Sequence, residues 1–326
     1  MGKYLVTGAS GFTGSKLCRW LRKDGHKVVA FVRPTSQTTE LEALGVECRQ
    51  VEIKSAQDVR DNFVDIEQVY HIAAAYRTEH VDLDEFRLVN VEATRNLLDA
   101  ARATGIQRFV HCSTVGVQGE IEDPPADEAY RMKPGDHYQQ SKLDGELLAR
   151  KYFDEGLPGT VVRPVGIYGP GDTRFLKLFR AVERGVFVMI GNGKTLYHMT
   201  HVDDLVDGIV RAGHRQQAIG EIFTIGGDGY TTIAELVNLV ADALDRPHPK
   251  WRIPFFPVYA AAVVCEAICR PLGISPPIYP RRVEFFQFDR AFNIDKAKKL
   301  LDYQPATPLK EGLQATADWY RENGLL

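Results

Sequence analysis

A tyrosine and a lysine that could serve one small reaction site lie four residues apart in the stretch Asp136–Glu146, which reads Asp-His-Tyr-Gln-Gln-Ser-Lys-Leu-Asp-Gly-Glu. The charged and apolar positions around them predict the first turns of a helix, where residues four apart share a face. A phenol ionises at about pH 10, and an adjacent ammonium favours the phenolate. Tyr138 and Lys142 could therefore form an acid–base pair. A surface tyrosine covering a solvated lysine stem would give the same spacing, so the rest of the chain must decide.

A glycine-rich turn near the start of the chain predicts a dinucleotide site. The stretch Val6–Gly14 reads Val-Thr-Gly-Ala-Ser-Gly-Phe-Thr-Gly, follows a strand-like run and opens a helical one. Glycine lets the backbone turn tightly and approach a pyrophosphate, while free N–H groups at a helix start attract its negative charge. A purely structural turn is the alternative. The residues expected to contact the cofactor here are Gly8, Ser10, Gly11, Phe12, Thr13 and Gly14.

The end of the second strand-like run, Lys27–Val32, indicates which dinucleotide is preferred. An acidic residue at this point would bind the ribose 2′-hydroxyl, whereas an arginine accommodates a 2′-phosphate. The chain has Arg33 there, followed closely by Thr35 and Ser36, and no acid. This pattern favours NADP(H) over NAD(H). A solvated arginine at a sheet edge is the alternative interpretation.

Strand-like and helical runs alternate through the first half of the chain, as they must to position these residues. The strand candidates are Tyr4–Val6, Lys27–Val32, Val46–Val51, Gln68–Ile72, Arg108–Ser113 and Thr160–Arg163. The helical patterns are Gly11–Asp24, Glu85–Thr104 and Asp136–Phe153. Short apolar strands alternating with helices form βαβ units. The sequence therefore predicts an α/β protein with a Rossmann-type, doubly wound parallel sheet.

The alternation loosens after about residue 170, which predicts a second, smaller and mostly helical region. Thr232 and Glu235 form a capping box that opens a helix through Leu244. The last helical pattern, Lys310–Asn323, stops at Gly324. We predict a dinucleotide-binding domain over 1–170, a substrate-binding region over 171–292, and C-terminal helices over 293–326 that return to pack on the first domain.

Composition limits the classes of partner. The 326 residues carry a formal net charge of −3, without the basic surface that nucleic acid requires. The five cysteines lack metal-type spacing and the start of the chain lacks a secretory pattern, so we expect reduced thiols, no metal and a cytoplasmic protein. The apolar run 254–272 is interrupted by Pro257, Glu266 and Arg270. It predicts a buried or groove-lining helix, with peripheral contact to a membrane as the alternative.

Three ordered motifs together resemble the extended short-chain dehydrogenase/reductases, a group similar to the NAD-dependent epimerases and dehydratases. They are the Thr7–Gly14 loop, the Ser113-Thr114 pair after a strand, and Tyr138 with Lys142. The resemblance implies that Tyr138 is the acid/base, that Lys142 steadies it and the cofactor ribose, and that a hydroxyl holds the substrate oxygen. Counting back from Gly119 puts Thr114 at the position of the family's catalytic serine, and Ser113 is the adjacent alternative.

The resemblance also implies further contacts. It places Ala73, in the turn His71–Ala75, and Pro164 on the cofactor side. His71 itself is not expected to be a catalyst. Asn90 matches a position that the family often fills with asparagine, although a helix cap is an equal interpretation. By analogy with the family, the helices 85–104 and 136–153 would form a homodimer interface.

One position separates the two chemistries that this family performs. Sugar-nucleotide enzymes usually have an asparagine where this chain has Gly166, and Arg163–Pro170 instead resembles the 3β-hydroxysteroid dehydrogenase and dihydroflavonol reductase branch, as do 251–254 and 281–288. We expect an NADP(H)-preferring oxidoreductase that interconverts a secondary alcohol and a ketone on an apolar, sterol-like substrate. The alternative is a nucleotide-sugar 4-epimerase or dehydratase with tightly bound NAD, which Thr200–Asp204 favours. A cofactor sensor without turnover is a third hypothesis, and the retained tyrosine–lysine pair argues against it.

Overall fold

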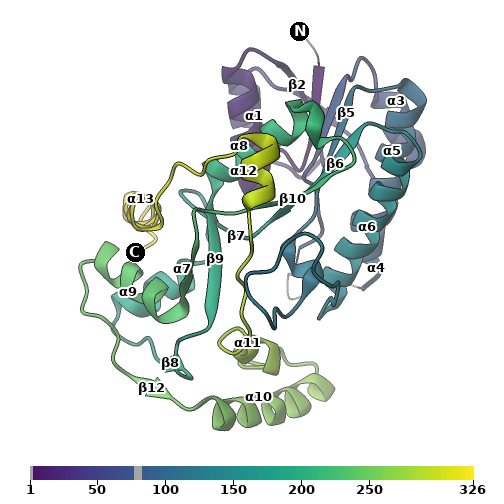
Figure 1. Cartoon of the computed structure of the whole chain (residues 1–326). Helices are drawn as coiled ribbons and strands as arrows, with labels where there is room; N and C mark the ends of the chain where they lie inside the picture. Colours follow the sequence, from purple (N-terminus) through teal and green to yellow (C-terminus); the bar gives the residue numbers. More distant parts are fainter. Residues whose placement is uncertain (1–2, 77–82) are drawn as a thin grey trace.

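Seven parallel strands form the central sheet of the protein, in the order β10-β6-β5-β4-β1-β2-β3 (Figure 1). The computed structural model describes residues 3–76 and 83–326. From β1 the strands are added first towards β3 and then, starting with β4, on the opposite side of β1. The direction of strand addition therefore changes between β1 and β4, and doubly wound sheets bind ligands at such a point. The strands are β1 Lys3–Thr7, β2 Lys27–Val32, β3 Glu47–Gln50, β4 Gln68–His71, β5 Arg108–Cys112, β6 Gly159–Pro164 and β10 Ile222–Ile225. The predicted Rossmann-type α/β fold is confirmed.

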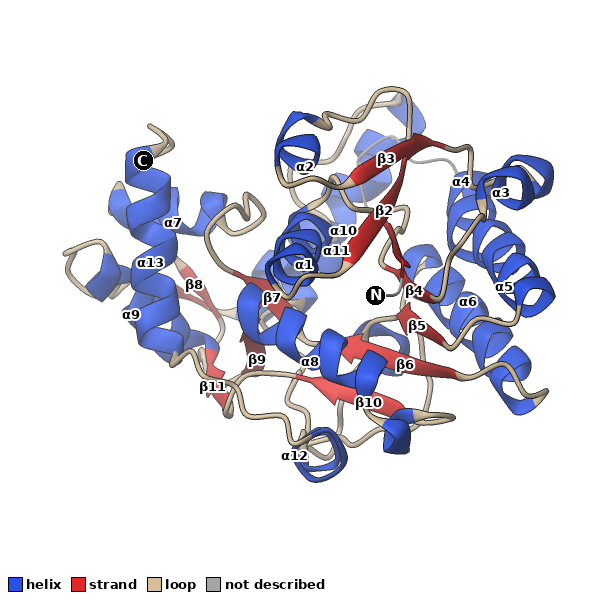
Figure 2. Ribbon diagram, turned by 90° about the horizontal axis from the view of Figure 1, so that it is seen from above, coloured by secondary structure: helices blue, strands red, loops and turns tan. Residues whose placement is uncertain are grey.

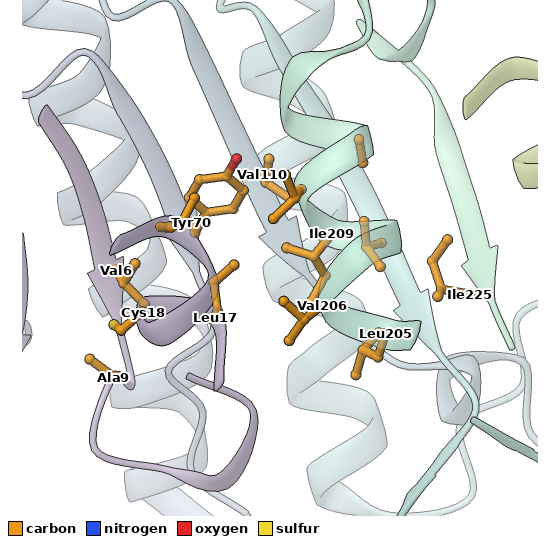
Figure 3. Packing of buried hydrophobic residues seen from close by; sticks show 14 of the residues in the cluster. Val6, Ala9, Leu17, Cys18, Tyr70, Val110, Leu205, Val206, Ile209 and Ile225 are labelled. Carbon is orange, nitrogen blue, oxygen red and sulfur yellow. The ribbon is translucent and has the colours of Figure 1, made fainter. Parts of the chain in front are cut away.

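Helices cover both faces of this sheet and bury its apolar side chains. One face carries α1 (Phe12–Lys23), α8 (Val202–His214) and α12 (Asp295–Leu301), and Figure 3 shows side chains of α1 and α8 that pack against the strands. The other face carries α3 (Ala56–Asn62), α5 (Ala93–Thr104) and α6 (His137–Asp154). The short α2 (Thr39–Ala43) precedes β3. Strands buried on both faces explain the nearly continuous apolar runs of the sequence.

The predicted helix Glu85–Thr104 is not regular along its length. It consists of α4 (Leu83–Arg87), a π-helical segment (Leu88–Glu92) and α5. Single π turns occur mostly at functional sites. This π-helical segment packs against α6, the helix that carries Tyr138 and Lys142.

A smaller unit beside the sheet combines short strands with helices (Figure 2). Strands β7 (Gly166–Tyr168), β9 (Leu196–His201) and β11 (Tyr230–Thr232) form one sheet, and β8 (Met189–Ile190) pairs with β12 (Arg252–Ile253). Helices α7 (Leu176–Glu183), α9 (Ile233–Ala243) and α13 (Leu309–Glu322) share a separate apolar core with them. The Thr232 hydroxyl accepts a hydrogen bond from the Glu235 N–H at the start of α9, as the capping box predicts.

The chain crosses between the two units more often than the predicted boundaries allow. Strand β10 and helix α8 lie within 171–292 yet belong to the large sheet. Helix α12 returns to that sheet as expected, but α13 packs on α9 in the smaller unit instead. Helix α13 also contacts β7, a strand of the smaller unit that lies within the predicted domain 1–170. The apolar face of α13 packs on α9, and sequence periodicity shows that such a face exists but not which element it contacts.

Helix α10 (Phe255–Cys269), which continues into a 3₁₀ turn at Arg270–Leu272, also differs from its predicted environment. The sequence predicts a buried or groove-lining helix, but only Ala262 is buried. The segment Phe255–Leu272 has the length and mean hydropathy of a membrane-crossing helix, and 6% of it is buried. Its outer side is solvent-exposed, while its inner side rests on α11 (Pro280–Glu284).

Candidate active site

A cavity of about 1650 Å³ lies at the carboxyl ends of the large sheet and extends to the smaller unit. Its wall contains all of the residues that the sequence assigned to cofactor binding or catalysis except Thr35, and their individual roles stay predictions. They are Gly8, Ser10, Gly11, Phe12, Thr13, Gly14, Arg33, Ser36, Ala73, Ser113, Thr114, Tyr138, Lys142 and Pro164. The chain thus brings the ends of five strands, β1, β2, β4, β5 and β6, and the helices α1 and α6 to a single site.

Helix α6 presents Tyr138 and Lys142 to this cavity from successive turns. The helix begins after Asp136, whose carboxylate accepts the Gln139 N–H at 2.6 Å and also pairs with Arg281 of α11. Lys142 is 3% exposed, and its Nζ donates to the Cys112 carbonyl at 2.6 Å. Burial lowers the pKa of Lys142, an effect that nearby Cys112 and Glu146 oppose. The ammonium is held in place at the end of β5.

Tyr138 is half-buried among aromatic rings. Its ring meets those of Tyr76 and Phe86 edge-on, with centroids 5.2 and 6.1 Å away. These contacts fix the ring plane without using the hydroxyl. The buried ammonium one turn further along the helix favours the phenolate over the phenol. The geometry suits a tyrosine that exchanges a proton with a bound substrate.

The two hydroxyls after β5 have different surroundings. The Ser113 Oγ donates to the Glu146 carboxylate at 2.6 Å, and Glu146 also forms an ion pair with Arg163 in which both side chains are 0% exposed. The Thr114 Oγ1 accepts the Gly116 N–H at 3.1 Å, which leaves its own proton for donation into the cavity. Thr114 is therefore better placed than Ser113 to hold a substrate oxygen. The Glu146–Arg163 pair was not found from the sequence, although Glu146 follows Lys142 by one helical turn.

The glycine loop has the shape that a pyrophosphate requires. Gly8 has φ +70°, and a Cβ there would lie 2.8 Å from the Ala73 nitrogen. A Cβ on Gly14 would lie 2.1 Å from the Gly8 carbonyl oxygen. Helix α1 has no side-chain cap and no acidic residue in its first turn, so its first N–H groups are left for an anion. These residues fit a dinucleotide.

Arg33 lies exposed at the rim of the cavity, at the end of β2. Its backbone N–H donates to the Ser36 Oγ at 3.2 Å, and the Ser10 Oγ donates to the same atom at 3.4 Å. The loop after β2 is thereby tied to the glycine loop. Thr35, which was expected to assist Arg33, is not part of the cavity wall.

His71 is buried and links neighbouring elements through both of its ring nitrogens. Its ring nitrogens meet the hydroxyls of Thr7 and Thr94 at 2.7 and 2.8 Å, and the Thr7 hydroxyl also accepts the Ala73 N–H at 3.2 Å. Burial, with a further contribution from Lys142, lowers the pKa of His71 to about 3. A neutral ring here joins β1 to the turn that faces the glycine loop.

Asn90 has a role that neither sequence interpretation described. It does not cap a helix; it lies in the π-helical segment, 2% exposed. Its side-chain amide accepts the Ala75 N–H at 2.9 Å and donates to the Ser141 Oγ, also at 2.9 Å. Asn90 thereby fastens the turn after β4 to the helix that carries Tyr138.

Gly166 and the residues around it close the far end of the cavity. A Cβ on Gly166 would lie 2.7 Å from the Tyr197 hydroxyl, and the Tyr197 ring packs on Phe285. Arg174 pairs with Asp172 at 2.7 Å. The aromatic residues on this part of the wall are Phe175, Phe187, Tyr197, Tyr279, Phe285, Phe286, Phe288 and Phe292. These rings give this end a large apolar surface, to which Arg174, Lys177, Arg281, Arg282 and Arg290 add positive charges.

The Thr200–Asp204 stretch has structural roles. His201 caps α8 by accepting the Asp203 N–H. The Asp204 carboxylate accepts the backbone N–H groups of Ala306 and Thr307, at 2.9 and 3.2 Å, and so anchors the segment that precedes α13. Across residues 3–76 and 83–326, no group of three or more His, Cys, Asp or Glu side chains is placed to hold a metal ion.

The residues 4–226 match the family model of the NAD dependent epimerase/dehydratase family. The chain belongs to this family. Its members include NAD(P)-dependent dehydrogenases and epimerases, so the protein is an enzyme of the extended short-chain type. The resemblance drawn from the three motifs is thereby confirmed.

The proteins similar to this chain include both hydroxysteroid dehydrogenases and a nucleotide-sugar epimerase. The chain is 32% identical over 344 residues to the 3 beta-hydroxysteroid dehydrogenase/Delta 5-->4-isomerase of Mycobacterium tuberculosis, covering 98% of this chain and 90% of the relative. It is 29% identical to the 3-beta-hydroxysteroid dehydrogenase of Mycolicibacterium neoaurum, covering 99% and 92%. The crystal structure of UDP-glucuronic acid 4-epimerase from Bacillus cereus with NAD is similar at a TM-score of 0.78 and 26% identity, covering 98% and 99%.

Two buried histidines predict that acid destabilises this enzyme. Burial lowers the pKa of His111 well below its usual range, as it does for His71, so both rings are neutral in the folded state. The unfolded chain binds a proton at each below about pH 6.5, so stability is lost as pH falls from that value towards the folded-state pKa. We expect His111→Leu to reduce this dependence by about 1.4 kcal/mol per pH unit. Urea unfolding between pH 7 and 5 measures it, and an unchanged slope would show a charged His111 in the folded enzyme.

Proposed function

We propose that the protein is an NADP(H)-preferring oxidoreductase that interconverts a secondary alcohol and a ketone on an apolar, sterol-like substrate. The observation that carries this proposal is Gly166, where the Tyr197 hydroxyl fills the space that an asparagine side chain would need to reach a sugar-nucleotide diphosphate. The aromatic wall beside it supports an apolar ligand. The similarity to two hydroxysteroid dehydrogenases over nearly the whole chain supports the same substrate class.

The arginines near the substrate end support the proposal as well. Arg174 pairs with Asp172 and donates to the Ile167 carbonyl, while Arg281 pairs with Asp136 at the start of α6. Arg252, a further candidate for holding a diphosphate, is not part of the cavity wall. A uridine diphosphate would have to displace internal partners to gain Arg174 or Arg281, whereas Lys177, Arg282 and Arg290 also line the wall and are the cations that the second candidate function would use. A neutral polycyclic substrate makes no such demand.

The chemistry follows from the positions of three side chains. When bound, the nicotinamide supplies the hydride acceptor or donor. The Thr114 hydroxyl donates a hydrogen bond to the substrate oxygen, because its own oxygen already accepts the Gly116 N–H. Tyr138 takes the alcohol proton in the oxidative direction and returns it in the reductive direction. Lys142, held by the Cys112 carbonyl, keeps a positive charge beside the phenolate.

Native mass spectrometry of freshly purified enzyme, followed by titration with NADPH and NADH, tests the proposal. An oxidoreductase must replace its used cofactor after each turnover. We therefore expect the purified protein to contain no cofactor and to bind NADPH reversibly and more tightly than NADH. Turnover of 3β-hydroxysterols with NADP⁺ would then identify the substrate class. Retained NAD that survives purification would contradict the proposal and favour a nucleotide-sugar 4-epimerase, the second candidate, which the similarity to the Bacillus cereus epimerase supports.

Arg33→Asp tests the cofactor preference separately. The exposed guanidinium at the end of β2 is the cation that would meet a 2′-phosphate. A hydrogen bond to a charged group contributes about 1.5–3 kcal/mol, so we expect NADPH affinity to fall about 10- to 100-fold. NADH affinity should change little or rise, because the new carboxylate can accept from a 2′-hydroxyl. Equal losses for both cofactors, measured by fluorescence titration, would remove Arg33 from the 2′-phosphate site.

We also propose that the protein is cytoplasmic and forms a homodimer through α5 and α6. The two helices pack side by side on one face of the sheet (Figure 2), and the apolar Leu147 of α6 is 49% exposed there. Light scattering on the purified protein measures the mass. A Leu147→Glu variant that stays dimeric would show that the dimer interface does not include this surface of α6.

A further inference from the structure

Helix α10 exposes an apolar half-cylinder to the surroundings of the protein. Phe256 is 80% exposed, and Val264 and Ile268 are each 57% exposed. On a helix of 3.6 residues per turn, the exposed positions cover about half of the circumference. They contain no polar side chain and are Phe256, Pro257, Ala260, Ala261, Val263, Val264, Ala267 and Ile268. A helix on a protein surface ordinarily turns charged residues outward.

The opposite side of α10 rests on the wall of the active-site cavity. The Tyr259 hydroxyl donates to the Glu284 carboxylate at 3.4 Å, and the buried Ala262 faces the same way. Glu284 belongs to α11, which lines the cavity together with the phenylalanines after it. Figure 1 shows α10 along the lower edge of the molecule, directly beneath α11. One short helix therefore separates the exposed apolar surface from the site.

The ends of α10 carry the residue types that are found at a lipid–water boundary. Trp251, 75% exposed, lies between Lys250 and Arg252 just before the helix, and Arg270 follows its last turn. Tryptophan prefers the headgroup level of a membrane, and basic residues are attracted to anionic lipid. The helix has one acidic residue, Glu266, which is on the inner side and pairs with Arg270.

The connections of α10 fit a helix that lies on a membrane rather than crossing it. The strand β12 before it pairs with β8, and the segment after it leads within ten residues to α11 of the same unit. Both ends are thus held by one folded body, and the short helix α11 contacts α10 between them.

We propose that α10 binds the interfacial layer of an anionic lipid bilayer and thereby places the α11 side of the cavity at the membrane. An apolar substrate then passes from the bilayer to the site without crossing water. The transfer of substrate from the bilayer rests on the proposed function, since it requires an apolar substrate. Membrane binding by α10 does not, because it depends only on the exposed residues of α10 and the cations at its ends.

Sedimentation of the full chain with lipid vesicles tests this proposal in the absence of any substrate. Vesicles of phosphatidylcholine alone are compared with vesicles that contain phosphatidylserine. We expect strong binding to the anionic vesicles, weaker binding to the neutral ones, and at least a tenfold loss for Phe256→Ser/Ile268→Ser. The matched control is Val64→Ser/Ile219→Ser, which removes two exposed apolar side chains from the large sheet's unit and should bind as the wild type does.

The outcomes separate the membrane proposal from the proposed function. Neither Phe256 nor Ile268 lines the cavity, so the α10 variant should keep the wild-type turnover of a small water-soluble alcohol if the enzyme has one. No binding to either vesicle, or an equal loss in the control, would overturn the proposal. Concentration-dependent dimerisation that the α10 variant abolishes would also overturn it and assign this surface to a second copy. Vesicle binding by an enzyme that acts on sugar nucleotides would uphold membrane binding and refute only the substrate transfer.

Discussion

Replacing Tyr138 by phenylalanine is expected to lower the turnover number about 10²–10⁴-fold, the range that general acid–base catalysis contributes. The substitution removes the hydroxyl that, on the proposed mechanism, exchanges a proton with the substrate oxygen, one helical turn from the buried ammonium of Lys142. Phenylalanine keeps the edge-on contacts with Tyr76 and Phe86, so the fold and the cavity shape should be retained. The dissociation constant for the cofactor should therefore stay nearly unchanged. Steady-state kinetics and a cofactor titration on the same preparation measure both quantities.

Tyr76→Phe is the matched control for this prediction. It removes a second phenol from the wall of the same cavity, but Tyr76 lies in the loop after β4 and not on the helix that carries Lys142. We expect its turnover to remain within the range of the wild-type enzyme. Near-normal turnover by the Tyr138 variant would rule out Tyr138 as the acid/base. A comparable loss in both variants would show that the aromatic cluster, rather than one hydroxyl, carries the effect.

Glu146→Gln is expected to destabilise the enzyme by about 3–5 kcal/mol, since breaking a buried ion pair leaves an uncompensated charge. The carboxylate accepts hydrogen bonds from the Arg163 guanidinium at 2.6 and 3.0 Å and from the Ser113 hydroxyl at 2.6 Å. Arg163 is fully buried, so water cannot solvate its guanidinium once the partner carboxylate has been removed. The midpoint of urea unfolding should fall without a change of slope. Because Glu146 lies on the same helix as Lys142, turnover should fall as well.

The surface pair Glu122–Arg131 provides the control. Glu122→Gln removes the same charge where water surrounds both side chains, so we expect no measurable change in the unfolding midpoint. The double variant Glu146→Gln/Arg163→Met should recover part of the stability that Glu146→Gln loses, because it no longer buries an unpaired cation. Equal effects of Glu146→Gln and Glu122→Gln would contradict the assignment of a buried, structurally important ion pair.

The parts of the site that the sequence predicted are those whose geometry is local. The glycine loop needs only a strand, a turn and a helix start, and its residues are consecutive. Tyr138 and Lys142 face the same way because one helix carries both. The family resemblance favoured Thr114 over Ser113 by position alone, but the physical difference between the two hydroxyls depends on a distant partner, since Glu146 engages Ser113 from another element. Sequence reasoning could place these two residues at the end of a strand but could not distinguish their environments.

What the sequence did not predict depends on long-range packing. Strand β10 has only four residues and pairs with β6, about sixty positions earlier in the chain. The π-helical segment around Asn90 is only five residues long, too short for a distinct apolar period to show in the sequence. An apolar run such as 254–272 reads as core, because periodicity reports apolar character and not what covers it. The exposed surface of α10 became visible only when the rest of the chain was in place.

The position of β10 sets an order of events during synthesis. The first 170 residues contain six of the seven strands, yet β6 receives its outer neighbour from 222–225, and α12 then packs against β10. A nascent chain that has emerged only as far as β6 presents an unpaired strand edge, the kind of surface that invites aggregation. The ribosome must release roughly the first 300 residues before the sheet is both paired and covered. The cofactor half of this enzyme is thus the first to begin folding and among the last to be finished.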